Sequence, residues 1–395
     1  MNAATASASS ISMYTTHMRS ALLAPILLAA ACAPLAPCPC PPPPVKPAPE
    51  TAVYLQYAFD ALPGWPSAGL ERSLRAFLAG CPRPGPLARA CDAAAAVPPG
   101  DEAAARQFFE ASFVPYALVS SDGPDSGLIT GYYEPIIEGS RTQSSEYRYP
   151  IFGVPEDLVT VELAATNPDL RGLRLRGRID GRRLVPYLSR GEIEARGVPA
   201  QVIAWTGDPV GLFFLQVQGS GQVRLDSGER IRIGFADQNG HPYRSLGRYL
   251  LDRGELPLEQ TSMQGIKTWA AANPAKLQEA LNSNPSYIFF RELPTTDGPP
   301  GALGVALTPE YSLAVDRRFV PLGSPVYLAT TYPLSEDRLE RMMAAQDTGG
   351  AIRGAVRADF YWGTGAEAGA LAGSMRQQGR MWLMWPRGEP LPRSD

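Results

Sequence analysis

The chain has 395 residues and a formal net charge of -3. This near-neutral balance leaves no basic footprint for nucleic acid, so we expect no nucleic-acid partner. Its 40 prolines and 38 glycines favour many short strands and turns over long helices. The length beyond about residue 50 is ample for one large or two moderate domains.

The first 50 residues are predicted to be a signal and a stalk. An apolar run from Ala21 to Ala31 follows Arg19 and ends at Cys32. It is too short to span a bilayer and has the flanks of a secretory signal. The residues before Cys32 resemble a bacterial lipoprotein cleavage box, although the leucine stands four residues before the cysteine instead of three. We therefore expect lipid on Cys32, with a plain secretion signal cut nearby as the alternative. A start at Met13 or Met18 would give a signal of ordinary length.

The cysteines and histidines exclude a zinc site of the usual kind. Cys38-Pro39-Cys40 and the prolines after it predict an extended stalk that buries no core. Cys81 and Cys91 are the only cysteines in the expected fold, and in an oxidising compartment they could pair. The chain has only 2 histidines and no cysteine cluster within the fold, so we predict no metal.

Two amphipathic helices are expected to open the fold. The first carries apolar residues at helical spacing, namely Leu70, Leu74, Phe77 and Leu78. The second follows Asp101 as its N-cap, ends before Pro115, and buries Ala105, Phe108 and Phe109.

Strands are expected next. A strand is predicted over 127–139, through the sequence TGYYEP, and a β-meander over 210–235. Phe213, Leu215 and Val217 alternate along the first strand of that meander, which reaches a turn at Asp226-Ser227-Gly228.

A helical block follows the meander. Ser245 is expected to cap a helix that stops at Gly254, Thr261 and Gln264 to form a capping box for a helix through Trp269, and Asn273-Pro274 to cap a helix through Leu281. Strands resume at 287–291 and continue to Trp385. We find no internal repeat.

The segment QDTGGAIRGAVRADFYWGTG, from Gln346 to Gly365, is the most informative. It holds Asp347 and Asp359 amid dense glycine, which indicates a tightly turned backbone that a ligand approaches closely. Tyr361 and Trp362 follow at once. Rings that stack on sugars, beside a carboxyl kept protonated by apolar surroundings, are what a sugar site needs. The alternative is a glycine-rich turn between core strands with two solvated acids.

Six motifs in chain order carry a family resemblance. They are TGYYEP (130–135), QVQGSG (216–221), GFADQNGHPYRSLGRYLLDRGE (234–255), NPSYIFF (284–290), AVDRRFVPLGSPVYL (314–328) and the segment 346–365. Together they strongly resemble the membrane-bound lytic murein transglycosylase A family, over roughly 128–385. The part from 304 to 385 looks like the small domain named for its three aspartates, which would here be Asp316, Asp347 and Asp359.

The resemblance implies a mainly β fold with several peripheral helices. A double-psi β-barrel catalytic domain would combine 51–135 with 284–395, and a second, smaller β-domain would be inserted at 136–283. The substrate would lie in the groove between the two domains.

The resemblance also implies the reaction. Family members cleave peptidoglycan glycan strands between N-acetylmuramic acid and N-acetylglucosamine without water. The muramic acid 6-hydroxyl attacks its own anomeric carbon and leaves a 1,6-anhydro end. One aspartate serves as acid and base, and motif matching assigns that role to Asp359, with no cofactor. The implied location is the periplasmic face of the bacterial outer membrane, with a lipid anchor.

The role of Asp347 stays open. It could stabilise the oxocarbenium-like state, orient Asp359, bind a sugar hydroxyl, or accept backbone N–H bonds from the Gly349-Gly350 turn. Burial of Asp359 beside the rings, or repulsion from Asp347, would raise its pKa and keep it protonated. Asp316 is expected to be structural, and Glu134 is an available acid with no implied role.

Further residues are predicted to bind the glycan. Thr130, Tyr132 and Tyr133 would line the groove, with one tyrosine facing the core because neighbours alternate along a strand. Gln216, Gln218 and Ser220 would share one strand face and hydrogen-bond acetamido groups, or else form an exposed sheet face. Asn239, Tyr243 and Arg244 would reach a peptide-stem carboxylate or a lactyl group, and Tyr361 would contact sugar.

Two other functions compete with the transglycosylase. The first is an inverting glycoside hydrolase on the same barrel, with Asp359 as acid and Asp347 positioning water. The second is a non-enzymatic peptidoglycan-binding lipoprotein, which ranks last because the chain retains Asp359. The sequence names no cell-wall synthesis protein as a partner.

Overall fold

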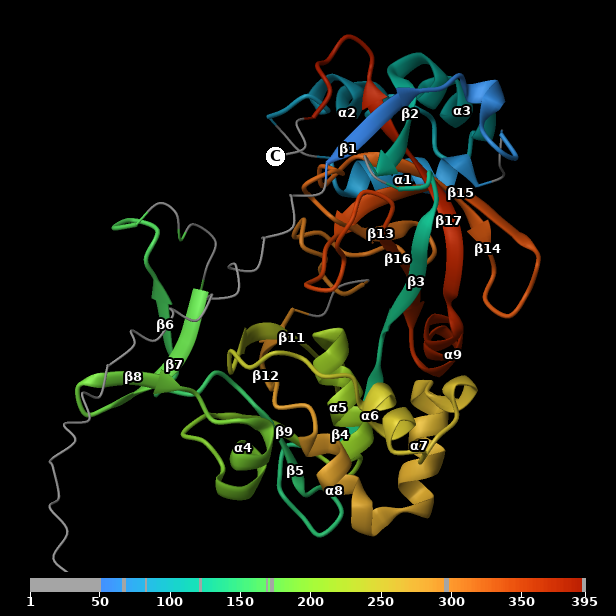
Figure 1. Cartoon of the computed structure of the whole chain (residues 1–395). Coiled ribbons are helices and arrows are strands. Elements are labelled where there is room, and N and C mark those ends of the chain that lie inside the picture. Colours follow the sequence, from blue (N-terminus) through green and yellow to red (C-terminus); the bar gives the residue numbers. More distant parts are fainter. Residues whose placement is uncertain are drawn as a thin grey trace, which may run out of the picture. The chain divides into compact units, whose positions relative to one another are not determined.

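The computed structural model describes residues 51–65, 69–81, 84–120, 123–167, 170, 174–294 and 298–392. The predicted signal, stalk and Cys32 lie outside the described residues. The largest sheet has eight strands, in the order β1 (Ala52–Gln56), β2 (Phe113–Ser120), β17 (Arg376–Pro386), β14 (Pro325–Thr331), β15 (Arg338–Asp347), β13 (Ser312–Val315), β16 (Ala358–Thr364) and β3 (Gly127–Glu134) (Figure 1). Strand β3 also pairs with β17, so the pairings from β17 through β14, β15, β13, β16 and β3 return to β17.

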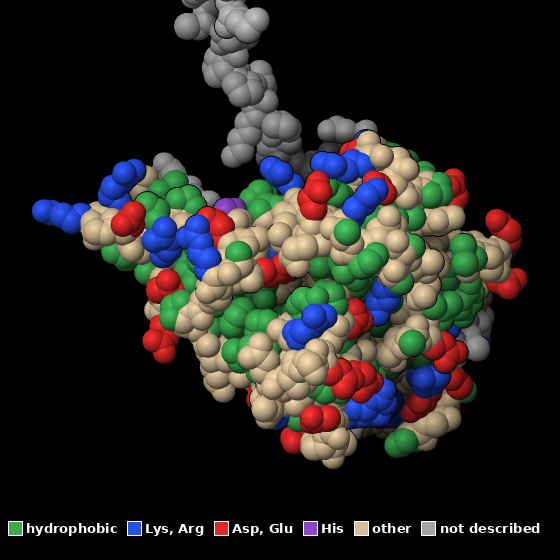
Figure 2. All heavy atoms as spheres, turned by 90° about the horizontal axis from the view of Figure 1, so that it is seen from below, with side chains coloured by type: hydrophobic (Ala, Val, Ile, Leu, Met, Phe, Trp, Pro, Cys, Tyr) green, Lys and Arg blue, Asp and Glu red, His purple; other side chains and the backbone are tan. Residues whose placement is uncertain are grey.

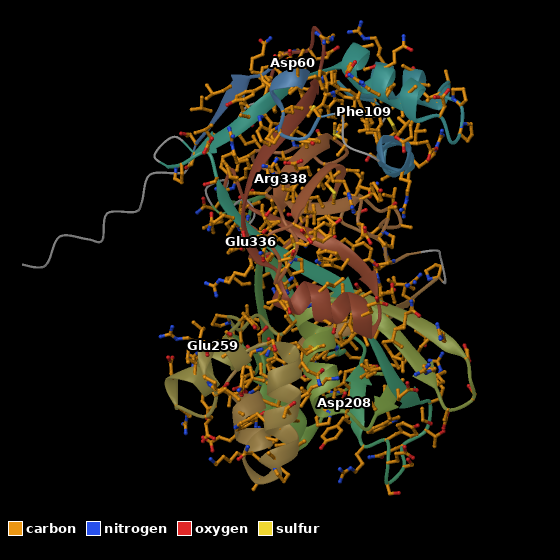
Figure 3. The ribbon with its side chains drawn as sticks, turned by 90° about the vertical axis from the view of Figure 1, so that its right-hand side faces the viewer. Asp60, Phe109, Asp208, Glu259, Glu336 and Arg338 are labelled. Atoms are coloured by element: carbon orange, nitrogen blue, oxygen red, sulfur yellow. A yellow bond between two sulfur atoms is a disulfide. The ribbon has the colours of Figure 1, made fainter. Side chains whose placement is uncertain are left out.

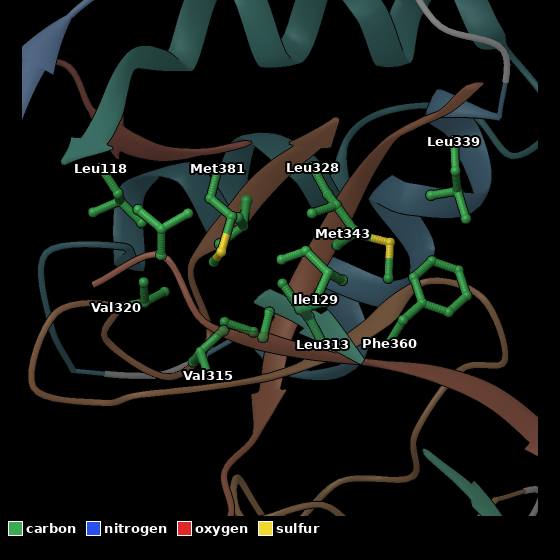
Figure 4. Packing of buried hydrophobic residues seen from close by; sticks show 14 of the residues in the cluster. Leu118, Ile129, Leu313, Val315, Val320, Leu328, Leu339, Met343, Phe360 and Met381 are labelled. Carbon is green, nitrogen blue, oxygen red and sulfur yellow. The ribbon is translucent and has the colours of Figure 1, made fainter. Parts of the chain in front are cut away.

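The main apolar core lies against these cyclically paired strands. Each of them contributes buried aliphatic, aromatic or methionine side chains, among them Ile129, Leu313, Leu328, Met343, Phe360 and Met381 (Figure 4). Alternate residues of a strand point to opposite faces, so these residues leave every second position for the other face. The core thereby fixes the strands that carry the candidate acids.

Three helices cover another part of this sheet. They are α1 (Leu70–Ala79), α2 (Ala88–Ala95) and α3 (Glu102–Ser112), and they bury a second cluster with Trp382 and Tyr327. The predicted helices at α1 and α3 are confirmed, as is the Asp101 cap, whose side chain accepts a bond from the N–H of Ala104. The predicted Cys81–Cys91 disulfide is present, with Cα atoms 5.7 Å apart, and joins the end of α1 to α2.

The middle of the chain forms two smaller sheets. One has the order β12 (Ile288–Leu293), β11 (Arg230–Gln238), β10 (Ser220–Leu225), β4 (Ile136–Ser140), β9 (Val202–Thr206) and β5 (Tyr149–Phe152). The other consists of β6 (Val159–Glu162), β7 (Arg174–Asp180) and β8 (Arg183–Pro186). The strand predicted over 127–139 is in fact two, because it breaks at Pro135 and continues as β4 in a different sheet.

The first strand predicted for the β-meander is wrong, because residues Pro209–Gln218 form helix α5. Asp208 caps this helix by accepting a bond from the N–H of Gly211, Pro209 opens it, and Gly219 ends it at φ 76° (Figure 3 labels Asp208). The helix is apolar on nearly all sides, so its hydrophobic pattern cannot distinguish it from a buried strand. The later turn at 226–228 is confirmed, since Leu225 and Glu229 close it between β10 and β11.

The remaining helices are α4 (Arg190–Arg196), α6 (Leu246–Asp252), α7 (Met263–Ala272), α8 (Pro274–Asn282) and α9 (Ala366–Ser374), with single 3-10 turns at Phe59–Ala61 and Leu258–Gln260. The Ser245 cap of α6 is confirmed. The capping box predicted at Thr261 and Gln264 is wrong, because Ser262 caps α7 through the N–H of Gly265. Pro274 opens α8, but the Asn273 amide makes no capping bond and donates to the carbonyl of Trp269 instead.

Candidate active site

Asp347 and Asp359 flank the same residue of a central strand. Ala314 on β13 is the register partner of Asp347 on β15 and of Asp359 on β16. Thr130 on β3 extends the row as the partner of Asp359. Adjacent strands are about 4.8 Å apart, so the two aspartate Cα atoms are separated by about 10 Å. Residues opposite one another across paired strands share a face, so these pairings bring two acids and a hydroxyl to one face of the sheet.

Asp359 is held by two polar side chains. The Thr130 hydroxyl donates to Asp359 Oδ1, and Arg357 Nη1 donates to the same oxygen over 2.7 Å. Arg357 Nη2 donates in turn to Thr130 Oγ1 over 2.9 Å, which closes a triangle of bonds. The Asp359 side chain is 21% exposed, so it is both fixed and accessible to a ligand. Arg357 lies two residues before Asp359 on the chain, and we had not predicted it as a site residue.

Asp347 is a partly buried acid whose pKa is shifted upward. Burial raises the pKa of its carboxyl above the ordinary 3.8, although hydrogen bonds from the N–H groups of Thr348 and Ala302, each 2.9 Å long, lower it. The negative charge of Asp359 raises the Asp347 pKa further. The sequence left open that Asp347 accepts backbone N–H bonds from the Gly349-Gly350 turn. Asp347 does accept backbone N–H bonds, but the donors are Thr348 and Ala302.

Tyr132 lies near both acids, whose charges act on its hydroxyl. Its hydroxyl is buried and makes no hydrogen bond of normal geometry among the described residues. Burial, followed by the charge of Asp347, raises the Tyr132 pKa well above 10. Its ring packs on Tyr361, its register partner, with centroids 5.2 Å apart.

The rings after Asp359 do not offer a sugar platform in this structure. Tyr361 is 1% and Trp362 is 6% exposed, so neither presents an open ring face. Tyr361 supports Tyr132 from below, while Trp362 packs in the main core. Tyr133 also faces that core, and its hydroxyl donates to the sulfur of Met263, so Tyr132 is the tyrosine of the pair that faces the acids.

Glu134 forms a buried network beside the site. Its carboxylate is fully buried and accepts bonds from Arg232 Nε (2.7 Å), Gln222 Nε2 (2.8 Å) and the Thr364 hydroxyl (2.9 Å). Glu134 and Thr364 end strands of the eight-stranded sheet, whereas Arg232 and Gln222 belong to the six-stranded one. The network therefore joins the two sheets at the end of β3, a few residues beyond the part of β3 that pairs with Asp359.

Asp316 makes a structural contact. Its carboxylate side chain is 1% exposed and is bound by the Arg318 guanidinium and the N–H of Gly354. Although burial raises the Asp316 pKa, these bonds lower it by more, so the net shift is downward. Asp316 thus anchors the glycine-rich segment and lies apart from the pair of acids.

Gln216, Gln218 and Ser220 do not share a strand face as expected. The two glutamines are on α5, where positions two apart are about 200° apart around the axis. Gln216 is 4% exposed, and its amide makes no hydrogen bond of normal geometry with the described residues. Gln218 accepts a bond from the N–H of Tyr133 over 3.4 Å, and Ser220 opens β10.

The other predicted binding residues differ in accessibility. Asn239 is 1% exposed, and its side chain bonds four backbone groups, which indicates a structural role. Tyr243 is 56% exposed, and Arg244 is exposed and makes no ion pair within the described part of the chain. Tyr243 and Arg244 are therefore free to meet a ligand, but Asn239 is not.

A cavity of about 240 Å³ is lined by parts of β3, α5, α7 and α9 and includes neither Asp347 nor Asp359. Within the described ranges, no three His, Cys, Asp or Glu side chains are grouped so as to hold a metal ion. No helix in that part of the chain is long and apolar enough to cross a membrane.

Comparison with known proteins identifies the class. The MltA specific insert domain matches residues 128–291, and the 3D domain matches residues 311–385. The membrane-bound lytic murein transglycosylase A of Escherichia coli K12 is 33% identical over 296 residues, 72% of each chain. The crystal structure of MltA from Neisseria gonorrhoeae has a TM-score of 0.78 at 40% identity and covers 87% of this chain and 95% of that one. E. coli MltA with bound chitohexaose has a TM-score of 0.62 at 28% identity and covers 86% and 95%.

These matches define a carbohydrate-active enzyme of the lytic murein transglycosylase class. Within that class, the chain belongs to the membrane-bound lytic murein transglycosylase A family. The mainly β architecture with several helices agrees with this membership.

Proposed function

We propose that this enzyme cleaves peptidoglycan glycan strands between N-acetylmuramic acid and N-acetylglucosamine and leaves a 1,6-anhydro end. The relatives are named for murein, and one was crystallised with chitohexaose, a chain of N-acetylglucosamine units. The observation that carries the proposal is the accessible Asp359, fixed by Thr130 and Arg357 beside a second acid, Asp347.

A single proton-carrying carboxyl suffices for this reaction. The muramic acid 6-hydroxyl is tethered to the ring that it attacks, so its effective concentration is high and no activated water is needed. Asp359 protonates the glycosidic oxygen as the bond to the anomeric carbon breaks. The same carboxylate then accepts the proton of the 6-hydroxyl as its oxygen bonds that carbon.

Arg357 and Thr130 are positioning residues in this proposal. Their three bonds fix one oxygen of Asp359, which leaves Oδ2 to face the glycan. For Asp359 to act as an acid, its carboxyl must carry a proton when the glycan is bound. Asp347 and Tyr132 supply a desolvated, negatively polarised floor under the oxocarbenium-like state.

The glycan is proposed to lie in a groove between two domains. We include two further features in this proposal. One is the division of the chain into a catalytic domain of 51–135 with 284–395 and an insert at 136–283. The other is the double-psi form of the cyclic strand pairing. The three-aspartate domain would occupy 304–385. The allocation of strands supports an inserted domain, since 52–134 and 312–386 supply the largest sheet and 136–293 supply the other two. It moves the end of the insert beyond residue 283, because β12 belongs to the six-stranded sheet. Gln218, Ser220, Tyr243 and Arg244 remain candidates for the glycan contact.

The enzyme is proposed to act at the periplasmic face of the outer membrane through lipid on Cys32. The names of the curated relatives contain the words membrane-bound, which supports a membrane attachment. Changing Cys32 to alanine should move the protein from the membrane fraction to the soluble fraction, and unchanged fractionation with an unmodified N-terminus would contradict this part.

The catalytic assignment is tested by Asp359→Asn, which keeps the shape but cannot deliver a proton. Digestion of purified sacculi should fall by about 10²–10⁴-fold, with chitohexaose binding retained. Asp125→Asn is the matched control, because Asp125 pairs with Arg380 at 50% exposure outside the cluster. Turnover by Asp359→Asn at the rate of this control would refute the assignment, and Asp347 would be the next candidate.

A further inference from the structure

The three-stranded sheet of β6, β7 and β8 has one face made of aliphatic residues. Register partners share a face, and here Val161 pairs with Leu175, and Ile179 with Leu184. Gly177 lies between them and pairs with Val159 and Pro186. This set, which we call the aliphatic face, consists of Val159, Val161, Leu175, Gly177, Ile179, Leu184 and Pro186.

The opposite face is charged, and it is the face that contacts the rest of the protein. Arg176 forms an ion pair with Asp237 of β11, and Thr160 donates to the same carboxylate over 3.4 Å. Arg176 also packs against Gly240, where a Cβ would come within 2.9 Å of it. Arg178 on this face has a buried Nε. Sheets normally turn their apolar face inward, so this arrangement is inverted.

The aliphatic face is consequently open to solvent. Ile179 is 58% exposed, Leu175 44% and Leu184 40%. It carries no aromatic ring to stack on a sugar and no side-chain amide or hydroxyl to bond one, so a glycan is a poor occupant. Its composition instead suits hydrocarbon.

Positive charge lies at the edge of this face. Arg182 lies in the β7–β8 turn, and Arg183 begins β8 as the register partner of Asp180. Both arginines are exposed and make no ion pair with any residue that the structure describes. At the left-hand end of Figure 2, where this sheet lies in Figure 1, Lys or Arg side chains stand next to hydrophobic ones. Aliphatic side chains beside free arginines match the boundary between acyl chains and anionic headgroups.

We propose that the aliphatic face and the Arg182–Arg183 turn form a second membrane contact, which docks on a lipid surface with anionic headgroups. Three strands of about five residues cover roughly 10 Å by 16 Å, on the order of 200 Å². A stable dimer needs about 800 Å² from each partner, so a second copy of the chain is disfavoured. Binding to a lipid surface scales with the apolar area that it buries plus the attraction of basic residues to anionic headgroups, so it does not need the area of a dimer interface.

The test uses the full chain with Cys32→Ala, so that no lipid anchor contributes. Co-sedimentation is measured with vesicles of phosphatidylcholine alone and with added phosphatidylglycerol. We expect binding to the anionic vesicles that falls about tenfold or more for Arg182→Glu with Arg183→Glu, and similarly for Ile179→Ser with Leu184→Ser. Leu334→Ser, at an 89% exposed leucine elsewhere, should bind like the parent.

Three outcomes would overturn the proposal. They are no binding to either vesicle, equal binding to both, and equal binding by the parent and the two double variants. Self-association that is lost in Ile179→Ser with Leu184→Ser would identify a second copy as the occupant and would also overturn it. Sacculus digestion by every variant is measured in parallel, since it reports the proposed function separately and should not change.

Discussion

Replacing Glu134 by glutamine should destabilise the protein strongly. The carboxylate is fully buried and pairs with Arg232, whose side chain is 6% exposed, so the change removes the negative charge that Glu134 supplies to a buried cation. Breaking such a pair costs about 3–5 kcal/mol. The NH2 group of the new amide would face either Gln222 and Thr364 or Arg232, and all three are donors to Glu134 now. For a chain of this size the melting temperature should fall by on the order of 10 °C.

The matched control is Glu138→Gln. Glu138 pairs with Arg224 between β4 and β10, but the two side chains are 58% and 49% exposed, so its loss should change stability several-fold less. Unfolding is followed by circular dichroism in urea and by thermal melting. Equal losses in the two variants would refute the argument from burial. Replacing both Glu134 and Arg232 by methionine should cost less than the sum of the single changes, because neither charge is then left alone.

Three further predictions concern the site and the fold. Arg357→Met should lower kcat for glycan cleavage with little change in chitohexaose affinity, and Arg357→Lys should keep part of the kcat that Arg357→Met loses. A loss of affinity without a loss of kcat would show that Arg357 binds sugar instead. Because the pKa of Asp347 is raised in the folded state, its titration makes folding stability depend on pH. Its contribution to the free energy of unfolding is fully present below pH 3.8 and is lost as the pH rises through the folded-state pKa. Asp347→Asn should therefore gain stability relative to the parent as melts move from below pH 3.8 to neutral pH, and a constant difference would count against burial as the cause. The double variant Cys81→Ala with Cys91→Ala should have a free energy of unfolding in urea about 2–4 kcal/mol lower than that of the parent. A reductant should lower the stability of the parent toward that of the variant and leave the stability of the variant unchanged.

The sequence was sufficient to predict features that depend on only a few neighbouring residues, such as helix caps. Asp101 and Ser245 cap helices as expected, since a short side chain before an apolar period satisfies free N–H groups. The spacing of Asp347 and Asp359 pointed to a site, but only the pairing of both with Ala314 brings them to one face. That pairing depends on a strand more than 30 residues away from either acid, which no local pattern reports.

Other features depend on burial and orientation, which a sequence does not show directly. Helix α5 is apolar all round, so a strand was inferred, although the Asp208-Pro209 start and the Gly219 stop were available as helix signals. Arg357 could have been noticed from its position two residues before Asp359, since residues two apart in an extended chain point to the same side. In the structure Arg357 directly precedes β16. The aliphatic face was missed because we predicted no strands over 159–186, and alternation along a strand would not have shown which face turns to solvent.

The products of glycan digestion test the central claim most directly. Purified sacculi are digested in ¹⁸O-labelled water, and the muropeptides are weighed by mass spectrometry. The account predicts 1,6-anhydromuropeptides, lighter by one water than hydrolysis products and free of label at the cleaved end, because the attacking oxygen belongs to the sugar itself. Reducing-end muropeptides that carry the label would contradict it and would identify the enzyme as a hydrolase, with Asp347 positioning water for Asp359.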